Sequence, residues 1–397
     1  MGGMFLAQWI VIDNKFDDIW YGITFTMSTI LLLLTSPFWG AWSDKVGKRM
    51  PFIKWTTLII ILTGIAISFT ATSSLPQISK VITVLILFFI LQYFYQISLI
   101  FYNSLLDKIS TPETRGKVSG IGDAFAEFSW LFSNVMLLPF SMGMITIFGQ
   151  AGRGQVFLPA TLALIIFGLP MLLWLKEDKK KIPTSPINFS TVFKQTISGF
   201  KSLLKEDKNI AVFLIGFMFV SDALLTASLY FAIYLDQIFK INDTQKVILV
   251  AILEIVATLS SLLFSKISDK IGIKKILVFA CLNLTFVYGS ISLTSSLPSM
   301  YILSALIGVG YGSFYTASRG LLAKLSPPSK LGEYFGIYST FQKFASILGP
   351  LLWGAIILLL KDYGLMRYRI GIMSLSILML IGTLIIFRVK EQKSQVL

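Results

Sequence analysis

The chain contains no histidine and a single cysteine in 397 residues. These shortages exclude a disulfide framework, a zinc site built from Cys and His, and any nucleophile activated by an imidazole. No nucleotide-binding loop is visible either. The sequence therefore predicts no metal site and no cofactor, and it indicates a protein that is not an enzyme.

Charged residues are also scarce, at 14% of the chain, whereas 55% of the residues are hydrophobic and the mean hydropathy is +0.77. A soluble domain needs a better solvated surface, so this composition predicts a membrane protein. The net charge of +14 would suit a nucleic-acid binder. However, the Lys and Arg residues lie between long apolar runs, so orientation in a membrane explains them better than nucleic acid does.

Apolar runs of roughly 20 residues, the length that crosses a bilayer, predict about eleven transmembrane helices. Ile276–Ser318 is about twice this length, so we expect it to fold back at Ser295–Pro298 and supply two spans. Met1–Ile12 is too short to cross. The remaining spans are expected at residues 19–42, 55–75, 81–106, 118–142, 155–175, 209–235, 247–265, 334–360 and 370–387.

Lys and Arg are unevenly divided between the two sides of these spans. Of the 34, one side holds 25, the other holds eight and Lys343 lies inside a span. The positive-inside rule makes the richer side cytoplasmic. The C-terminus is then inside and the N-terminus outside. Without a transit or retention signal, a bacterial cytoplasmic (inner) membrane is expected.

The only long hydrophilic stretch, residues 176–208, is expected to be a cytoplasmic linker with an amphipathic helix at the membrane surface. We prefer a simple linker role to a regulatory or lipid-sensing role. The segment is expected to contact membrane lipids in both cases. The linker separates a transmembrane half at 1–175 from another at 209–390, with a cytoplasmic tail at 391–397.

Two short motifs recur along the chain. Ser43–Arg49 (SDKVGKR) is echoed by Ser268–Gly272 (SDKIG), and Gly116–Gly120 by Gly332–Gly336. Such echoes are typical of transporters with duplicated halves of six helices. Twelve helices would then be expected, so one span is missing.

The motif residues resemble those of a known superfamily. Gly40-x-x-x-Asp44-x-x-Gly47-Lys48-Arg49 resembles the loop motif between helices 2 and 3 of the major facilitator superfamily, and Ser265-x-x-x-Asp269-x-x-Gly272 resembles its weaker twin. The segments Ser318–Pro328, Glu333–Tyr338 and Lys343–Pro350 further resemble the branch of the autophagy-related vacuolar amino-acid effluxers and their bacterial relatives.

The resemblance implies a major facilitator fold that works as a monomer. Nothing before Trp20 matches the first helix of the family, so we expect two pseudo-repeated six-helix halves with the first helix missing. The resemblance also implies a cytoplasmic gate, although cytoplasmic charge clusters usually reflect only topology. The gate residues are Gly40, Asp44, Gly47, Lys48, Arg49, Asp269, Gly272 and Arg319.

Ionisable side chains inside the spans are costly and therefore need an explanation. The candidates for substrate binding or ion coupling are Asp222, Glu254, Glu127, Lys343 and Asp123. One interpretation is that Lys343 neutralises Glu254 or Asp222 in a buried pair that only fixes packing. The other is that a carboxylate binds a proton or an amino group in one state and releases it in another.

Three functions follow from these residues. The favoured one is a secondary transporter of a small polar solute, such as an amino acid, with the proton as the candidate coupling ion. A truncated, non-transporting remnant or receptor is the alternative, because loss of helix 1 removes a wall of the usual cavity. An intramembrane aspartyl protease is a weaker alternative, because Gly120-Ile121-Gly122-Asp123 fits a Gly-x-Gly-Asp form.

Overall fold

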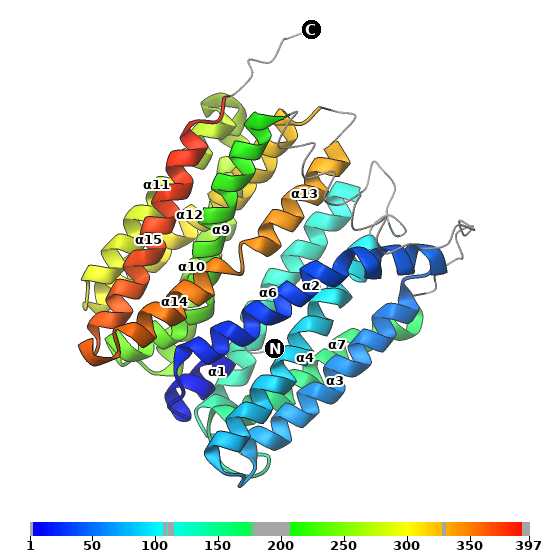
Figure 1. Cartoon of the computed structure of the whole chain (residues 1–397), viewed down its shortest axis with the longest axis vertical. Coiled ribbons are helices and arrows are strands. Elements are labelled where there is room, and N and C mark those ends of the chain that lie inside the picture. Colours follow the sequence, from blue (N-terminus) through cyan, green and yellow to red (C-terminus); the bar gives the residue numbers. More distant parts are fainter. Residues whose placement is uncertain are drawn as a thin grey trace. The chain divides into compact units, whose positions relative to one another are not determined.

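A computed structural model of the chain describes residues 3–105, 109, 115–175, 177, 207–327 and 331–390. Within these residues the regular structure is helical, and ten helices are long and apolar enough to cross a membrane (Figure 1). The remaining predicted span corresponds to α6 (Arg115–Ser141). The predicted all-α membrane fold is thereby confirmed.

The chain forms two compact units, and the first comprises Met1–Phe16 and Trp20–Ile197. Residues 3–13 form only short helices, and α3 packs against both α4 and α7. Besides α6, this unit contains α1 (Gly3–Gln8), the π-helical turn η1 (Trp9–Asp13), α2 (Asp18–Val46), α3 (Met50–Thr72), α4 (Gln77–Ser104), the 3₁₀ turn η2 (Arg153–Val156) and α7 (Phe157–Trp174).

A tyrosine joins α2 to α4 inside the first unit. The hydroxyl of Tyr93 lies 2.9 Å from Thr35 Oγ1 and accepts a hydrogen bond of 3.1 Å from the indole Nε1 of Trp39. Because a buried Tyr hydroxyl normally finds a polar partner, these bonds fix the register of the two helices. Apolar side chains including Leu32, Ile53 and Phe101 form the core around them.

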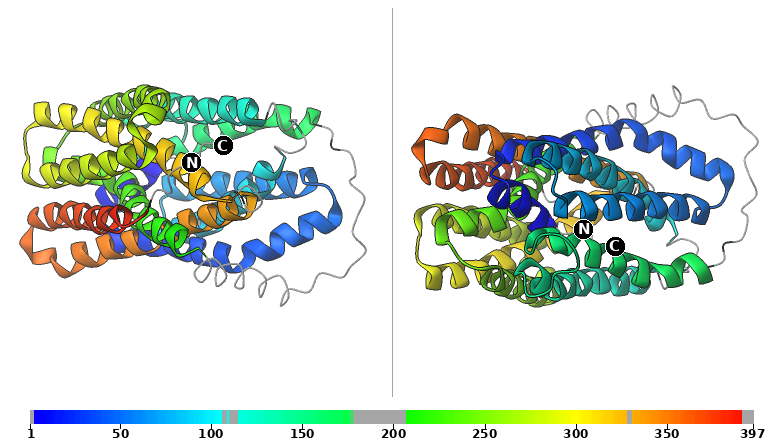
Figure 2. Two further views of the ribbon diagram at one scale, coloured as in Figure 1. Left: turned by 90° about the horizontal axis from the view of Figure 1, so that it is seen from above. Right: turned by 90° about the horizontal axis from the view of Figure 1, so that it is seen from below.

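The second unit comprises Asp17–Ile19 and Ser198–Leu397. In it α10 packs against α12, α11 against α12 and α15, and α9 against α13, α14 and α15 (Figure 2). The elements are α9 (Lys208–Tyr234), the π-helical turn η3 (Leu235–Phe239), α10 (Asp243–Ile271), α11 (Ile273–Leu293), α12 (Leu297–Leu325), α13 (Leu331–Phe344), α14 (Leu348–Leu359), the 3₁₀ turn η5 (Lys361–Tyr363) and α15 (Met366–Phe387).

The predicted linker and tail fall largely outside the described residues, which include neither 178–206 nor 391–397. The expected fold-back inside Ile276–Ser318 is present, because α11 ends at Leu293 and α12 begins at Leu297. A difference concerns Asp17–Ile19, which lies in the predicted N-terminal half but packs with the second unit.

Glycines of α12 allow it to approach α10 closely. A Cβ at Gly308 would lie 2.4 Å from the backbone oxygen of Leu253, and one at Gly312 would lie 2.0 Å from that of Ala257. Both distances are far below van der Waals contact, so only glycine fits at these positions. The close packing holds α10 and α12 together along their length.

The predicted single span at residues 334–360 is interrupted in the structure. The helix α13 ends at Phe344 and α14 begins at Leu348, with residues 345–347 outside regular helix. Pro350 accounts for the interruption, because proline has no N–H to bond the backbone oxygen four residues earlier and its ring crowds that oxygen. The two half-helices both pack against α9.

Candidate functional site

Asp222 occupies the middle of α9, the most buried of the described candidate spans. Its side chain is 1% exposed, and that of Thr226, one helical turn further along, is fully buried. Residues four apart lie on one face of a helix, so the carboxylate and the hydroxyl face the same neighbours. This face meets the beginning of α14.

Gly349 brings α14 into direct contact with these two side chains. A Cβ at this position would lie 2.0 Å from Thr226 Oγ1 and 3.0 Å from Asp222 Oδ1. The backbone of Gly349 lies close to the carboxylate. Nevertheless, neither Asp222 oxygen nor Thr226 Oγ1 has a partner at hydrogen-bonding geometry among the described residues. The site thus concentrates three buried oxygens without a partner at hydrogen-bonding geometry in the part of the chain that the structure describes.

Lys343 does not neutralise Asp222. It lies near the end of α13 and is half-buried, yet the carboxylate of Asp222 makes no ion pair in the part of the chain that the structure describes. The packing-pair interpretation therefore fails for Asp222. The aspartyl-protease alternative rests on Asp123, whose side chain lies outside the described residues.

The other predicted carboxylates lie on other helices. Glu254 is half-buried in α10, the helix that packs against α12. Asp123 and Glu127 belong to α6 of the first unit, one helical turn apart, and their side chains lie outside the described residues. Their proposed roles stay predictions.

A second buried carboxylate, Asp18, is not among the site residues predicted from the sequence. It is 2% exposed at the first turn of α2. Its Oδ1 accepts a hydrogen bond of 3.2 Å from Trp353 Nε1, and its Oδ2 accepts one of 3.4 Å from the hydroxyl of Tyr368. One sequence feature does point to Asp18. It is an acidic residue directly before an apolar run, a place where an acid usually caps a helix or meets a partner.

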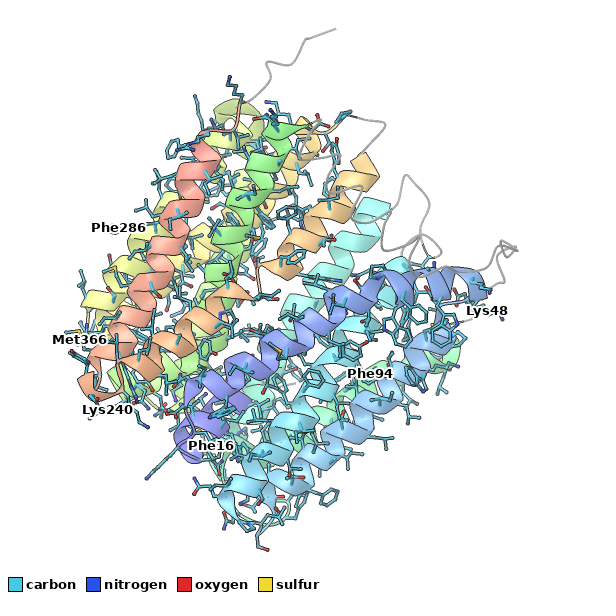
Figure 3. All side chains as sticks on the ribbon, in the orientation of Figure 1. Phe16, Lys48, Phe94, Lys240, Phe286 and Met366 are labelled. Atoms are coloured by element: carbon cyan, nitrogen blue, oxygen red, sulfur yellow. The ribbon has the colours of Figure 1, made fainter. Side chains whose placement is uncertain are left out.

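The gate motif lies at the turn from α2 to α3. Gly47 adopts a φ of +70°, which favours glycine and lets the chain turn sharply. Nη1 of Arg49 donates a hydrogen bond of 2.6 Å to Ser43 Oγ. Lys48 follows at the same end of α2 (Figure 3). The side chain of Asp44 lies outside the described residues.

Glu177, just after α7, caps the beginning of α3. Its Oε2 accepts hydrogen bonds from the backbone N–H groups of Arg49 at 2.5 Å and of Met50 at 2.8 Å. A carboxylate at a helix N-terminus satisfies donors that have no partner inside the helix and complements the helix dipole. Nothing in the sequence predicts this role, because Glu177 lies 128 positions from Arg49.

The twin motif lies between α10 and α11. Gly272 ends α10 with a φ of +98°, again a conformation that suits glycine. The side chain of Asp269 lies outside the described residues, and Arg319 is exposed in α12. A Cβ at Gly40 would meet no atom within 4 Å, so local packing does not require glycine there.

Comparison with solved structures identifies the fold. A bacterial homologue of the human lysosomal transporter Spinster, in an inward-facing and occupied conformation, matches with a TM-score of 0.71 at 13% identity, covering 99% of this chain and 96% of that one. The D323A mutant of the nucleoside transporter NupG matches with a TM-score of 0.70 at 15% identity, covering 97% and 94%. The predicted major facilitator fold is confirmed.

The sequence model described as "Vacuole effluxer Atg22 like" matches residues 108–396. The chain belongs to the Atg22-like family. A curated relative in this transporter group is the uncharacterized MFS-type transporter YxiO of Bacillus subtilis (strain 168), 24% identical over 94% of this chain and 85% of its own length. Autophagy-related protein 22 of Yarrowia lipolytica is 26% identical over 49% of this chain, and the match spans only 38% of that protein.

Proposed function

We propose that this Atg22-like protein is a secondary active transporter that carries a small polar solute by alternating access, with Asp222 as the residue that binds the coupling cation. The observation that carries the proposal is the buried carboxylate of Asp222, which has neither an ion pair nor a hydrogen bond among the described residues. An ionised side chain at mid-membrane costs roughly 2.5–3.5 kcal/mol or more. An ionisable residue inside the membrane marks a candidate functional site, and a bound cation would neutralise this carboxylate.

The helix interruption supports the same role. In transporters, discontinuous helices expose backbone groups near the middle of the membrane, where substrates and coupling ions bind. Here the interruption at residues 345–347 lies just before Gly349, which contacts Asp222 and Thr226. The proton predicted from the sequence is the smallest cation that such a site accepts.

Amino acids are the first solute class to test, because the sequence resembles vacuolar amino-acid effluxers and the family is described as a vacuole effluxer. Nucleosides are the second class, because a matching solved structure is a nucleoside transporter. The chain is proposed to work as a monomer in the cytoplasmic membrane, surrounded by lipid, with its C-terminus cytoplasmic and its N-terminus outside.

The test is uptake into proteoliposomes of a mixed amino-acid and nucleoside panel, with an inward proton or sodium gradient. We expect uptake of at least one solute by the native protein and a loss of about tenfold or more in Asp222→Asn. Asp362→Asn is the matched control, because Asp362 is exposed in η5. Failure of every solute under both gradients would instead support the non-transporting alternative.

A further inference from the structure

We propose that Asp222 and Thr226 form a binding site for one sodium ion at the beginning of α14. This inference rests on the proposed transport function but names its coupling ion, and it replaces the proton expected from the sequence. Two observations carry it. The oxygens have no partner at hydrogen-bonding geometry among the described residues, and the geometry brings them to one place.

The separation of the oxygens suits a single ion. Thr226 Oγ1 and Asp222 Oδ1 lie 2.0 Å and 3.0 Å from the same point, the Cβ position of Gly349, so they are at most 5.0 Å apart. A cation of the size of Ca²⁺ or Na⁺ takes oxygen ligands at roughly 2.3–2.6 Å. One such ion therefore bridges two oxygens up to about 5 Å apart.

The charge of the site selects a monovalent ion. Asp222 is the only carboxylate in the proposed ligand set, and no group of three or more acidic, His or Cys side chains that could hold a metal ion occurs among the described residues. A divalent cation in a buried site is usually bound by more carboxylates. One carboxylate and one sodium ion are neutral together, which removes the cost of an isolated buried charge.

The surroundings explain why the second oxygen is needed. A proton requires only the carboxylate, whereas sodium requires several oxygen ligands, and the buried hydroxyl of Thr226 supplies one of them. Backbone oxygens of residues 345–347, where α13 and α14 are interrupted, complete the shell in this proposal. Lys343 is the nearest cationic residue in sequence on these half-helices, and it makes no ion pair with Asp222.

The chain offers a matched control in Ser221. This serine is 2% exposed, and its hydroxyl also has no partner at hydrogen-bonding geometry. Successive residues of an α-helix lie about 100° apart around its axis, so Ser221 faces away from the site, toward Tyr315 of α12. Thr226→Val removes a proposed ligand, whereas Ser221→Ala removes a buried hydroxyl outside the site.

The first measurement is thermal unfolding of the purified full-length chain in detergent, at constant ionic strength and pH, in sodium, potassium or choline chloride. We expect a rise in Tm in sodium alone that grows with the logarithm of the sodium concentration and reaches about 2 °C at ten times the dissociation constant. The rise should disappear in Asp222→Asn, shrink in Thr226→Val and persist in Ser221→Ala. Equilibrium binding of radioactive sodium should give one ion per chain.

The outcomes separate this site from the proposed function. The sodium site would be overturned if the native protein had the same Tm in sodium as in potassium and bound no radioactive sodium. The native protein alone decides this point, even if the variants fail to fold. If uptake then follows a proton gradient without sodium, the transport function stands and only the ion is wrong. Sodium binding that survives in Asp222→Asn would place the ion elsewhere and also overturn the proposal.

Discussion

The indole Nε1 of Trp353 donates a hydrogen bond to Oδ1 of Asp18, a residue 335 positions earlier in the chain. The bond joins Asp18 to α14 within the second unit. Tyr230 adds to the cluster, because its ring stacks on Trp353 with 5.0 Å between centroids and its hydroxyl lies 3.4 Å from the backbone oxygen of Asp18. These contacts explain why Asp17–Ile19 belongs to the second unit.

Asp18→Ala should destabilise the protein by about 1–3 kcal/mol, because it leaves two buried donors without an acceptor. Asp18→Asn retains one side-chain oxygen and should cost less. Asp17→Ala is the control, since Asp17 forms a partly exposed ion pair of 3.8 Å with Lys361, a kind of pair worth only about 0–1 kcal/mol. Thermal unfolding in detergent measures how strongly each of the three substitutions destabilises the protein. Equal effects of the two alanine substitutions would contradict the expected order.

Glu177→Ala should weaken the first turn of α3, because the N–H groups of Arg49 and Met50 lose their acceptor. The expected cost is about 0.5–2 kcal/mol. Glu177→Gln keeps an acceptor oxygen and loses only the charge, so it should retain much of the cap. Hydrogen exchange of the amides at the beginning of α3 is the measurement. Unchanged exchange in the alanine variant would show that Glu177 does not cap this helix.

Gly349→Ala should be destabilising, because the new Cβ would lie 2.0 Å from Thr226 Oγ1. Overpacking of this kind costs typically about 1–3 kcal/mol. Gly336→Ala provides a matched control in α13, where a Cβ meets no atom within 4 Å and alanine is favoured in helices by about 1 kcal/mol. In thermal unfolding, the Tm should therefore fall in Gly349→Ala and rise in Gly336→Ala. A neutral Gly349→Ala would mean that α14 shifts freely from α9.

Lys246→Met should cost about 3–5 kcal/mol, the range for removing one partner of a buried ion pair. The ammonium group is fully buried and lies 2.8 Å from Asp236 Oδ1 and 3.1 Å from Asp243 Oδ1. Without it, two carboxylates would face each other. Lys240→Met is the control, because Lys240 is exposed after η3 (Figure 3). A loss of stability no greater than that of the control would show that the pair is not needed.

The sequence by itself determined the fold class and located the apolar spans. Apolar runs of spanning length must become helices in a bilayer, because only internal hydrogen bonds satisfy the backbone there. The repeated motif and the branch residues indicated the major facilitator fold for the same chain. Asp222 was also found from the sequence, because an ionisable residue stands out in an apolar run whatever its neighbours are.

Only the tertiary structure decided which groups meet. The partners of Asp18 and Glu177 lie more than one hundred positions away, and spacing along a chain carries no information about such contacts. The interruption before Gly349 and the absence of a Lys343 pair at Asp222 likewise depend on how α9, α13 and α14 pack. Side-chain chemistry within one helix can be read locally, whereas neutralisation of a buried charge is a property of several helices together.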